Sequence, residues 1–483
     1  MNYRLVFKII GKTMLIAAAL LLVPVIVALV YKETDKLSAF IIPAAALCAI
    51  GAVPSCIKIK ERSYGAKEGF VIVALCWLLL SFAGCVPFIV SGEIPGLADA
   101  FFETVSGFTT TGASVLNDVE ILSRSVMFWR IFTHWIGGMG VLVFVLTVIP
   151  ESETGGTYIF SAESPGPSAT KIVGKMKYTA QILYGIYIVL TAICTLFLVC
   201  GGMSFYDSLL NAFSTAGTGG LSVHNGSIAY YKSAYVEIVL SVFMFLFGVN
   251  FNVYFLIVSG SVLKALKSEE MITYVVMLAV SAFVIAVNIT GTVANFGVAL
   301  RQAFFQVTSI SSTTGASTAN FDKWPALSKS VLLFLTMIGA CGGSTGGGVK
   351  VSRMVILLKS CFADIRKTVN KREVVAVKFE NKPLTRTLVS GVYSFFALYI
   401  FIVIAATVLL SFGSFAEGDV LTHFTASLTC ISNVGPGLNF VGPTCSFAGY
   451  NAFSKCVLSF VMLAGRLEIY PMLILFAPRT WKR

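Results

Sequence analysis

Ten long apolar segments, separated by short polar stretches, dominate the pattern along this chain. Each has about 20 residues or more, the length that an α-helix needs to cross the hydrocarbon core of a bilayer. They lie at residues 13–31, 38–57, 69–90, 125–149, 181–202, 233–262, 271–291, 327–358, 386–411 and 452–477. The pattern predicts an all-α, polytopic membrane protein.

Four shorter apolar stretches interrupt this series, at residues 97–109, 204–216, 300–312 and 419–432. Segments of this length are too short to span a bilayer and suit helices that enter the membrane and turn back. The composition agrees with a membrane protein, because only 12% of residues are charged, against about 25% in soluble domains.

The basic residues indicate the orientation. If ten helices alternate across the membrane, the loops rich in Lys and Arg all fall on one side, which is then the cytoplasm. These are Arg4, Lys8, Lys12, Lys58, Lys60, Arg62, Lys67, Lys264, Lys267, the 350–386 segment, Arg479, Lys482 and Arg483. Both termini are then cytoplasmic, the four short helices lie on the outer side, and the net charge of +12 gives no reason to expect nucleic acid as a partner.

One unit occurs four times. The stretches AFFETVSGFTTTG, DSLLNAFSTAGTG, AFFQVTSISSTTG and HFTASLTCISNVG align on Gly112, Gly219, Gly315 and Gly435. Each follows a long helix, contains a short one and precedes another long one. The expected organisation is two amino-terminal helices in 1–65, followed by parallel repeats at 66–160, 170–268, 269–370 and 380–483. Inverted-repeat transporters would place alternate copies upside down.

The four Thr, Ser and Gly stretches predict a ring. Irregular backbone at membrane depth survives only where it is buried in protein or lines water. Glycine permits backbone conformations that a side chain disfavours, so successive carbonyls can point inward. A ring of carbonyl and hydroxyl oxygens replaces the water shell of a monovalent cation, and each short helix directs its negative end toward it.

A second glycine-rich stretch, CGGSTGGG at 341–348, interrupts the eighth apolar segment. It does not match the phosphate-binding pattern GxxxxGK[ST], because Val351 follows Lys350. Such a density of glycine breaks a helix, and the resulting loop is expected to line the pathway. Arg466 is a charge within the last apolar segment, which by default suggests a function; the alternative is that it snorkels or pairs with Glu468.

At these residues the chain resembles the Trk/Ktr/HKT superfamily of potassium transporters, and within it the bacterial TrkH pore subunits. The resemblance covers the whole chain and includes HWIGGMG (134–140), MIGACGGSTGGGVK (337–350) and AGRLEIYP (464–471). The two helices within 13–57 are similar to TrkH and absent from the typical KtrB pattern. In the superfamily, glycine at all four filter positions accompanies potassium selectivity, so the resemblance implies potassium as the substrate and no cofactor in this chain.

The filter prediction names three residues in each copy: Thr110, Thr111, Gly112, Gly217, Thr218, Gly219, Thr313, Thr314, Gly315, Asn433, Val434 and Gly435. The gate that the resemblance implies comprises Gly342, Gly343, Ser344, Thr345, Gly346, Gly347, Gly348 and Arg466. In the family, this loop blocks the path below the filter and the arginine repels cations and anchors it.

The resemblance also implies partners and a location. One partner is a second copy of the chain, which gives a homodimer in which each protomer has its own pore. The other is a cytoplasmic TrkA-like ring of nucleotide-binding subunits, and the location is the bacterial inner membrane. No GxGxxG occurs in this chain, so nucleotide control would come from such a partner. A KtrB-like sodium-dependent system and a carrier for an organic solute are the alternatives, and an enzyme is not expected. Whether protons or sodium move with potassium, as in a symport, stays open.

Overall fold

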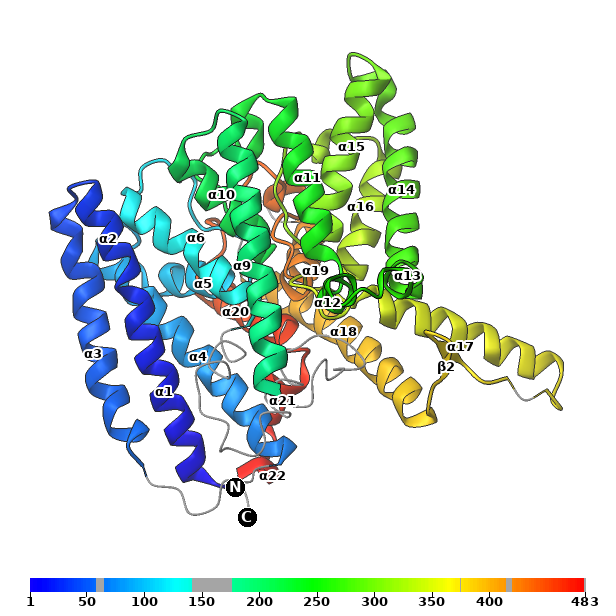
Figure 1. Cartoon of the computed structure of the whole chain (residues 1–483), viewed down its shortest axis with the longest axis horizontal. Helices are drawn as coiled ribbons and strands as arrows, with labels where there is room; N and C mark the ends of the chain where they lie inside the picture. The colour runs from blue at the N-terminus through cyan, green and yellow to red at the C-terminus, as the bar shows by residue number, and fades with distance from the viewer. Residues whose placement is uncertain (58–64, 141–175, 374, 414–418, 482–483) are drawn as a thin grey trace.

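The computed structural model describes residues 1–57, 65–140, 176–373, 375–413 and 419–481, which form an assembly of helices (Figure 1). The strands in this part of the chain are the short antiparallel pair β1 (Lys378–Phe379) and β2 (Lys382–Pro383). The expectation of an all-α polytopic protein is confirmed. Among the described residues, six helices are long and apolar enough to cross a membrane, or seven if one bent pair counts as a span.

The amino-terminal helices form a hairpin at one side of the molecule (Figure 1). Helices α1 (Tyr3–Leu21) and α2 (Val23–Val30) together make one span, and α3 (Leu37–Ser55) returns beside α1. The backbones touch where they cross, since a Cβ added to Gly51 would lie 2.9 Å from Gly11 O. Small residues allow this close approach of helices in lipid, where no hydrophobic effect drives them together.

Four helix–short helix–helix units follow, and the four predicted short helices are confirmed. Their elements are α4 (Ala66–Val90), α5 (Leu97–Phe108) and α6 (Arg124–Gly138); α9 (Met176–Cys200), α10 (Phe205–Gly217) and α11 (Ala234–Gly248); α14 (Glu269–Ile289), α15 (Phe296–Ser311) and α16 (Ala326–Ile338); and α18 (Arg386–Phe412), α19 (Val420–Ser432) and α20 (Ala452–Arg466). We call α5, α10, α15 and α19 the pore helices.

Several segments predicted as long helices are broken. The sixth divides into α11 and α12 (Phe251–Val258), which meet at 90°, and is followed by α13 (Val262–Leu266). The eighth divides at the glycine-rich loop, as predicted, into α16 and α17 (Val351–Val369). The tenth divides into α20 and α21 (Tyr470–Phe476), before α22 (Pro478–Trp481). The expected continuation of 125–149 beyond Gly140 lies outside the described residues.

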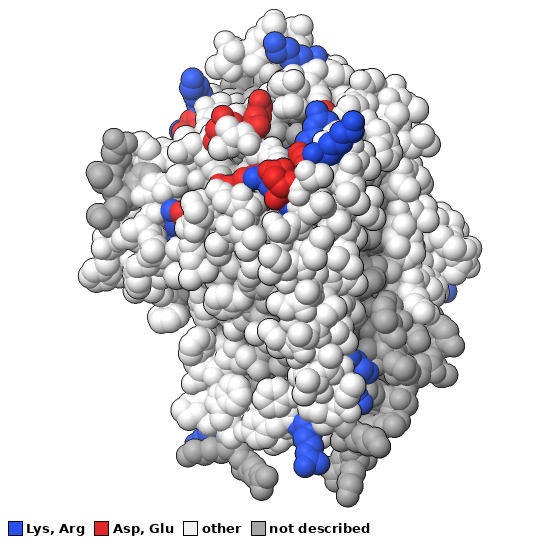
Figure 2. Space-filling model, turned by 90° about the vertical axis from the view of Figure 1, so that its left-hand side faces the viewer, with Lys and Arg blue, Asp and Glu red and all other residues white. Residues whose placement is uncertain are grey.

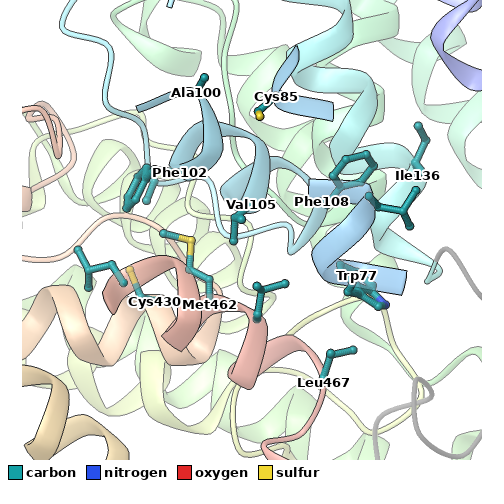
Figure 3. Packing of buried hydrophobic residues seen from close by; sticks show 14 of the residues in the cluster. Trp77, Cys85, Ala100, Phe102, Val105, Phe108, Ile136, Cys430, Met462 and Leu467 are labelled. Atoms are coloured by element: carbon teal, nitrogen blue, oxygen red, sulfur yellow. The ribbon is translucent and has the colours of Figure 1, made fainter. Parts of the chain in front are cut away.

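The surface and the core agree with a membrane setting. On the face in Figure 2, charged side chains gather toward the two ends, and the broad band between them is almost entirely uncharged. Inside, the pore helices of the first and fourth units share one apolar cluster with α20. Figure 3 shows Phe102 and Val105 of α5 in this cluster with Cys430 of α19 and Met462 of α20.

Candidate ion pathway: filter ring and gate loop

The four pore helices end in the same way. The residue after the last turn has a left-handed backbone in each: φ is 55° at Thr110, 54° at Thr218, 62° at Thr313 and 54° at Asn433. The N–H of each donates to the carbonyl three residues back, and the next N–H donates to the carbonyl five residues back. These two bonds define the Schellman motif, which closes the end of a helix and turns the chain away from it.

Three of these four residues are threonine, which rarely adopts a positive φ because its Cβ is branched. The left-handed conformation costs about 1–2 kcal/mol per non-glycine residue. Strain of this kind persists only where the surrounding structure imposes it, and it gathers at functional sites. The observation therefore points to the segments that follow the pore helices as the functional site.

A second residue of positive φ follows two positions later and is glycine in every copy: Gly112 (79°), Gly220 (73°), Gly315 (76°) and Gly435 (95°). A Cβ on Gly112 would lie 1.9 Å from Gly219 O of the second copy, and one on Gly220 would lie 1.9 Å from Thr314 O of the third. The equivalent distances are 2.0 Å from Gly315 to Val434 O and 2.6 Å from Gly435 to Thr111 O. Each copy thus touches the next, and the fourth touches the first, which closes the ring.

The ring surrounds one cavity. All four of these glycines line the same cavity, with a volume of about 510 Å³. Its rim carries Asn225, whose amide donates to Asp118 Oδ1 at 2.7 Å. This bond, together with the Glu120 N–H, holds the pKa of the exposed Asp118 carboxyl below its ordinary value. A carboxylate that stays charged near the opening raises the local cation concentration.

The register predicted for the second copy is off by one residue. Gly220, not Gly219, has the positive φ and the place that Gly112 has in the first copy. Gly219 corresponds to Thr111, and a Cβ there would lie 2.4 Å from the His134 ring. Gly217 is the last residue of α10 and packs against His134 O. These two glycines therefore make room for α6.

The side chains of the filter segments also connect the copies. Asn433 Nδ2 donates to Thr111 Oγ1 of the first copy and to Met462 O, each at 3.0 Å. The hydroxyls of Thr314 and Ser312 lie 2.7 Å apart. The hydroxyls of Thr111 and Thr314 are thus engaged in hydrogen bonds within the protein, and Asn433 closes the joint between the fourth copy and the first.

The glycine-rich loop lies directly beneath the ring. Gly347 N donates to Thr313 Oγ1 at 2.8 Å, and a Cβ on Gly347 would lie 2.2 Å from Ser432 O. The loop also reaches the second unit, where Thr345 Oγ1 donates to Phe247 O and Phe251 N donates to Gly343 O. It therefore contacts the ends of the second, third and fourth units at once.

Arg466 connects this loop to the first unit. Its Nη1 donates to Thr345 O at 2.7 Å and to Thr110 Oγ1 at 3.3 Å, and its Nη2 donates to Gly138 O at 2.7 Å. The alternative pairing partner, Glu468, accepts two hydrogen bonds from Arg353, at 3.1 and 2.7 Å. The guanidinium and the loop together lie below the filter.

Three buried residues to which the sequence analysis gave no role contact the candidate pathway. Glu270 of α14 accepts a hydrogen bond from Gly342 N at 2.7 Å, and Lys350 Nζ donates to Gly346 O. His134 Nδ1 lies 2.7 Å from Gly107 O, and Leu221 N donates to its Nε2 at 3.3 Å. A signal existed for Lys350 and His134, since both stand within apolar segments, where polar side chains are usually functional.

Comparisons with known proteins agree with this geometry. The family model of TrkH, described as a cation transport protein, matches residues 36–483. The TrkH potassium uptake proteins of Salmonella typhimurium and Escherichia coli K12 are 33% and 32% identical, with both chains covered completely. The crystal structure of the potassium transporter TrkH from Vibrio parahaemolyticus matches with a TM-score of 0.88 and 30% identity over all of both chains. The chain belongs to the TrkH family of cation transport proteins.

Proposed function

We propose that this chain is the pore subunit of a gated potassium uptake system. The observation that carries the proposal is the closed ring of four backbone segments, each in van der Waals contact with the next around one cavity. Backbone carbonyls arranged in this way replace the hydration shell of a monovalent cation. The names of the relatives, Trk system potassium uptake proteins, agree with potassium as that cation.

The proposed potassium site is formed by Thr110–Gly112, Thr218–Gly220, Thr313–Gly315 and Asn433–Gly435, with Gly220 in place of the predicted Gly217. The gate consists of residues 342–348 and Arg466. The loop is held under the ring by hydrogen bonds from Gly347 N–H to Thr313 and from Arg466 to Thr345 O. The path opens when these bonds break and the loop moves away. The guanidinium adds an electrostatic barrier, since like charges repel strongly where little water screens them.

The proposed setting is the bacterial inner membrane with both termini in the cytoplasm. The chain is proposed to act as a homodimer in which each protomer has its own pore. A cytoplasmic ring of TrkA-like nucleotide-binding subunits is proposed to control opening. The orientation rests on the distribution of Lys and Arg. The four repeats are proposed to span residues 66–160, 170–268, 269–370 and 380–483.

The test is complementation. Cells that lack potassium uptake, expressing this chain, are expected to grow in low external potassium, and purified protein in liposomes is expected to pass potassium without any added organic solute. A lack of potassium flux in both assays would refute the proposal. Uptake that requires external sodium would instead support a KtrB-like system, which is not favoured because the TrkH relatives match along the entire chain.

A further inference from the structure

A buried ion pair stands behind the outer end of the first filter segment. Arg130 Nε of α6 donates to Glu103 Oε1 of α5 at 2.6 Å. The side chains are only 2% and 0% exposed. A charge pair this deeply buried is expensive to form, and it persists only when hydrogen bonds satisfy both partners.

Those hydrogen bonds lead to the outer ends of two filter segments. Glu103 Oε2 accepts from Val115 N at 2.9 Å, and Ser114 Oγ lies 3.0 Å from Glu103 Oε1. Arg130 donates through Nη2 to Ser114 Oγ and through Nη1 to Ser222 O, both at 3.1 Å. Ser114 and Val115 follow Gly112 by two and three residues, and Ser222 follows Gly220 by two. The pair therefore holds two neighbouring filter segments at fixed positions.

The four copies differ at this position. Glu103 stands nine residues before Gly112, and the same offset from the other positive-φ glycines gives Asn211, Gln306 and Ala426. Gln306 Nε2 donates to Ala319 O, after the third filter segment, at 3.4 Å. This longer hydrogen bond between uncharged groups ties the third segment to its pore helix more weakly than the ion pair ties the first. Of these four positions, only that of the first copy carries a charged residue.

Arg130 also lines the outer cavity. A guanidinium at that place would repel an entering cation unless a nearby negative charge offset it. Glu103 supplies that charge at hydrogen-bonding distance. The carboxylate thus has two separable effects: it fixes the outer end of the filter, and it neutralises the arginine.

We propose that Glu103 and Arg130 are positioning residues that set the preference of the filter for potassium over sodium. The proposal rests on the proposed potassium function. Selectivity depends on carbonyls held at distances that suit potassium, and this pair holds the segments of the first two copies. Loss of the pair lets these segments relax, so the smaller sodium ion is coordinated more easily.

The test compares four variants of the full-length protein in liposomes and planar bilayers. Glu103→Gln is expected to lower potassium flux about tenfold, because the charge of Arg130 is then uncompensated. Glu103→Gln combined with Arg130→Met is expected to restore much of that flux, while the potassium-to-sodium permeability ratio stays below that of the wild type. Ser114→Ala keeps the ion pair but removes a hydroxyl that contacts both partners. It is expected to lower the potassium-to-sodium permeability ratio without lowering the potassium flux.

The control is Glu237→Gln, which breaks a less buried ion pair between Glu237 of α11 and Arg301 of α15, whose Oε2 and Nε atoms lie 2.8 Å apart. It is expected to leave the permeability ratio unchanged. A wild-type ratio in both Ser114→Ala and the double variant would overturn the proposal, and Ser114→Ala decides the question if the charge variants do not fold. Failure of the wild-type protein itself to pass potassium would refute the proposed function instead.

Discussion

The replacement Gly112→Ala gives the sharpest test of the ring. Gly112 has φ of 79°, and a Cβ there would lie 1.9 Å from Gly219 O. Gly92 offers a matched control, because its φ is 77° and nothing lies within 4 Å of an added Cβ. The two replacements share the cost of a left-handed alanine and differ only in the contact with the second copy.

The magnitudes follow from these distances. A left-handed non-glycine residue costs about 1–2 kcal/mol, which is the whole effect expected at Gly92. Overpacking adds about 1–3 kcal/mol, so Gly112→Ala costs about 2–5 kcal/mol. The atom in the way is a backbone oxygen of the neighbouring filter segment, so only a shift of the ring relieves the overlap.

The assay is potassium flux into liposomes, measured for each variant relative to the amount of folded protein. Because 1.4 kcal/mol corresponds to a factor of ten, the overpacking of about 1–3 kcal/mol is expected to lower the flux of Gly112→Ala about fivefold or more. Gly92→Ala is expected to lower the melting temperature slightly and to keep wild-type flux. If Gly112→Ala passes potassium with wild-type rate and selectivity, the ring is not the selectivity filter.

Three further changes test other parts of the structure. Arg466→Ala removes the barrier and the bond to Thr345 O, so potassium flux without any partner is expected to rise, as measured in liposomes; unchanged flux contradicts the gate. Glu270→Ala removes the acceptor of Gly342 N–H and is expected to raise basal flux, whereas Glu270→Gln keeps an acceptor and should raise it less. Gly51→Leu separates α3 from Gly11 and is expected to lower stability by about 1–3 kcal/mol in thermal unfolding, with flux per folded molecule unchanged.

The sequence was sufficient to predict the four short helices and the glycine-rich break after Ile338, because length, periodicity and glycine density act locally. It was not sufficient to fix the register of the second copy. The stretch GTGG offers three glycines within four residues, and only contact with Thr314 O of the third copy identifies Gly220 as the one with positive φ. Register between distant segments is a tertiary property.

The breaks after Gly248 and Arg466 were also missed, for a related reason. The chain at 249–250 contains no proline and no run of glycines. Its bend is held by Cys341 N, which donates to Gly248 O, and by Phe251 N, which donates to Gly343 O. Arg130, in contrast, could have been found, since it is a charge within the fourth apolar segment and the rule applied to Arg466 covers it equally.

The upper and lower parts of the pathway have different symmetry, and this difference has a physical reason. All four copies have the same helix end and the same positive-φ glycine, as the proposed coordination of one dehydrated ion by equivalent walls requires. A gate requires one element that moves relative to the others. Below the ring, a Cβ on Gly137 would lie 1.9 Å from Phe108 O, and one on Gly465 would lie 2.0 Å from Ile431 O. These glycines seat α6 and α20 directly against their pore helices.

The third unit departs from this arrangement, because α16 stops at Ile338 and the loop 339–350 passes under the ring before α17 begins. Arg466 joins this loop to the carbonyl of Gly138 at the end of α6. The fixed helix ends thus provide the acceptors that hold one guanidinium, and the guanidinium holds the loop. In the proposed gate, opening would therefore break a few hydrogen bonds at one place, while the four walls of the proposed filter keep their positions.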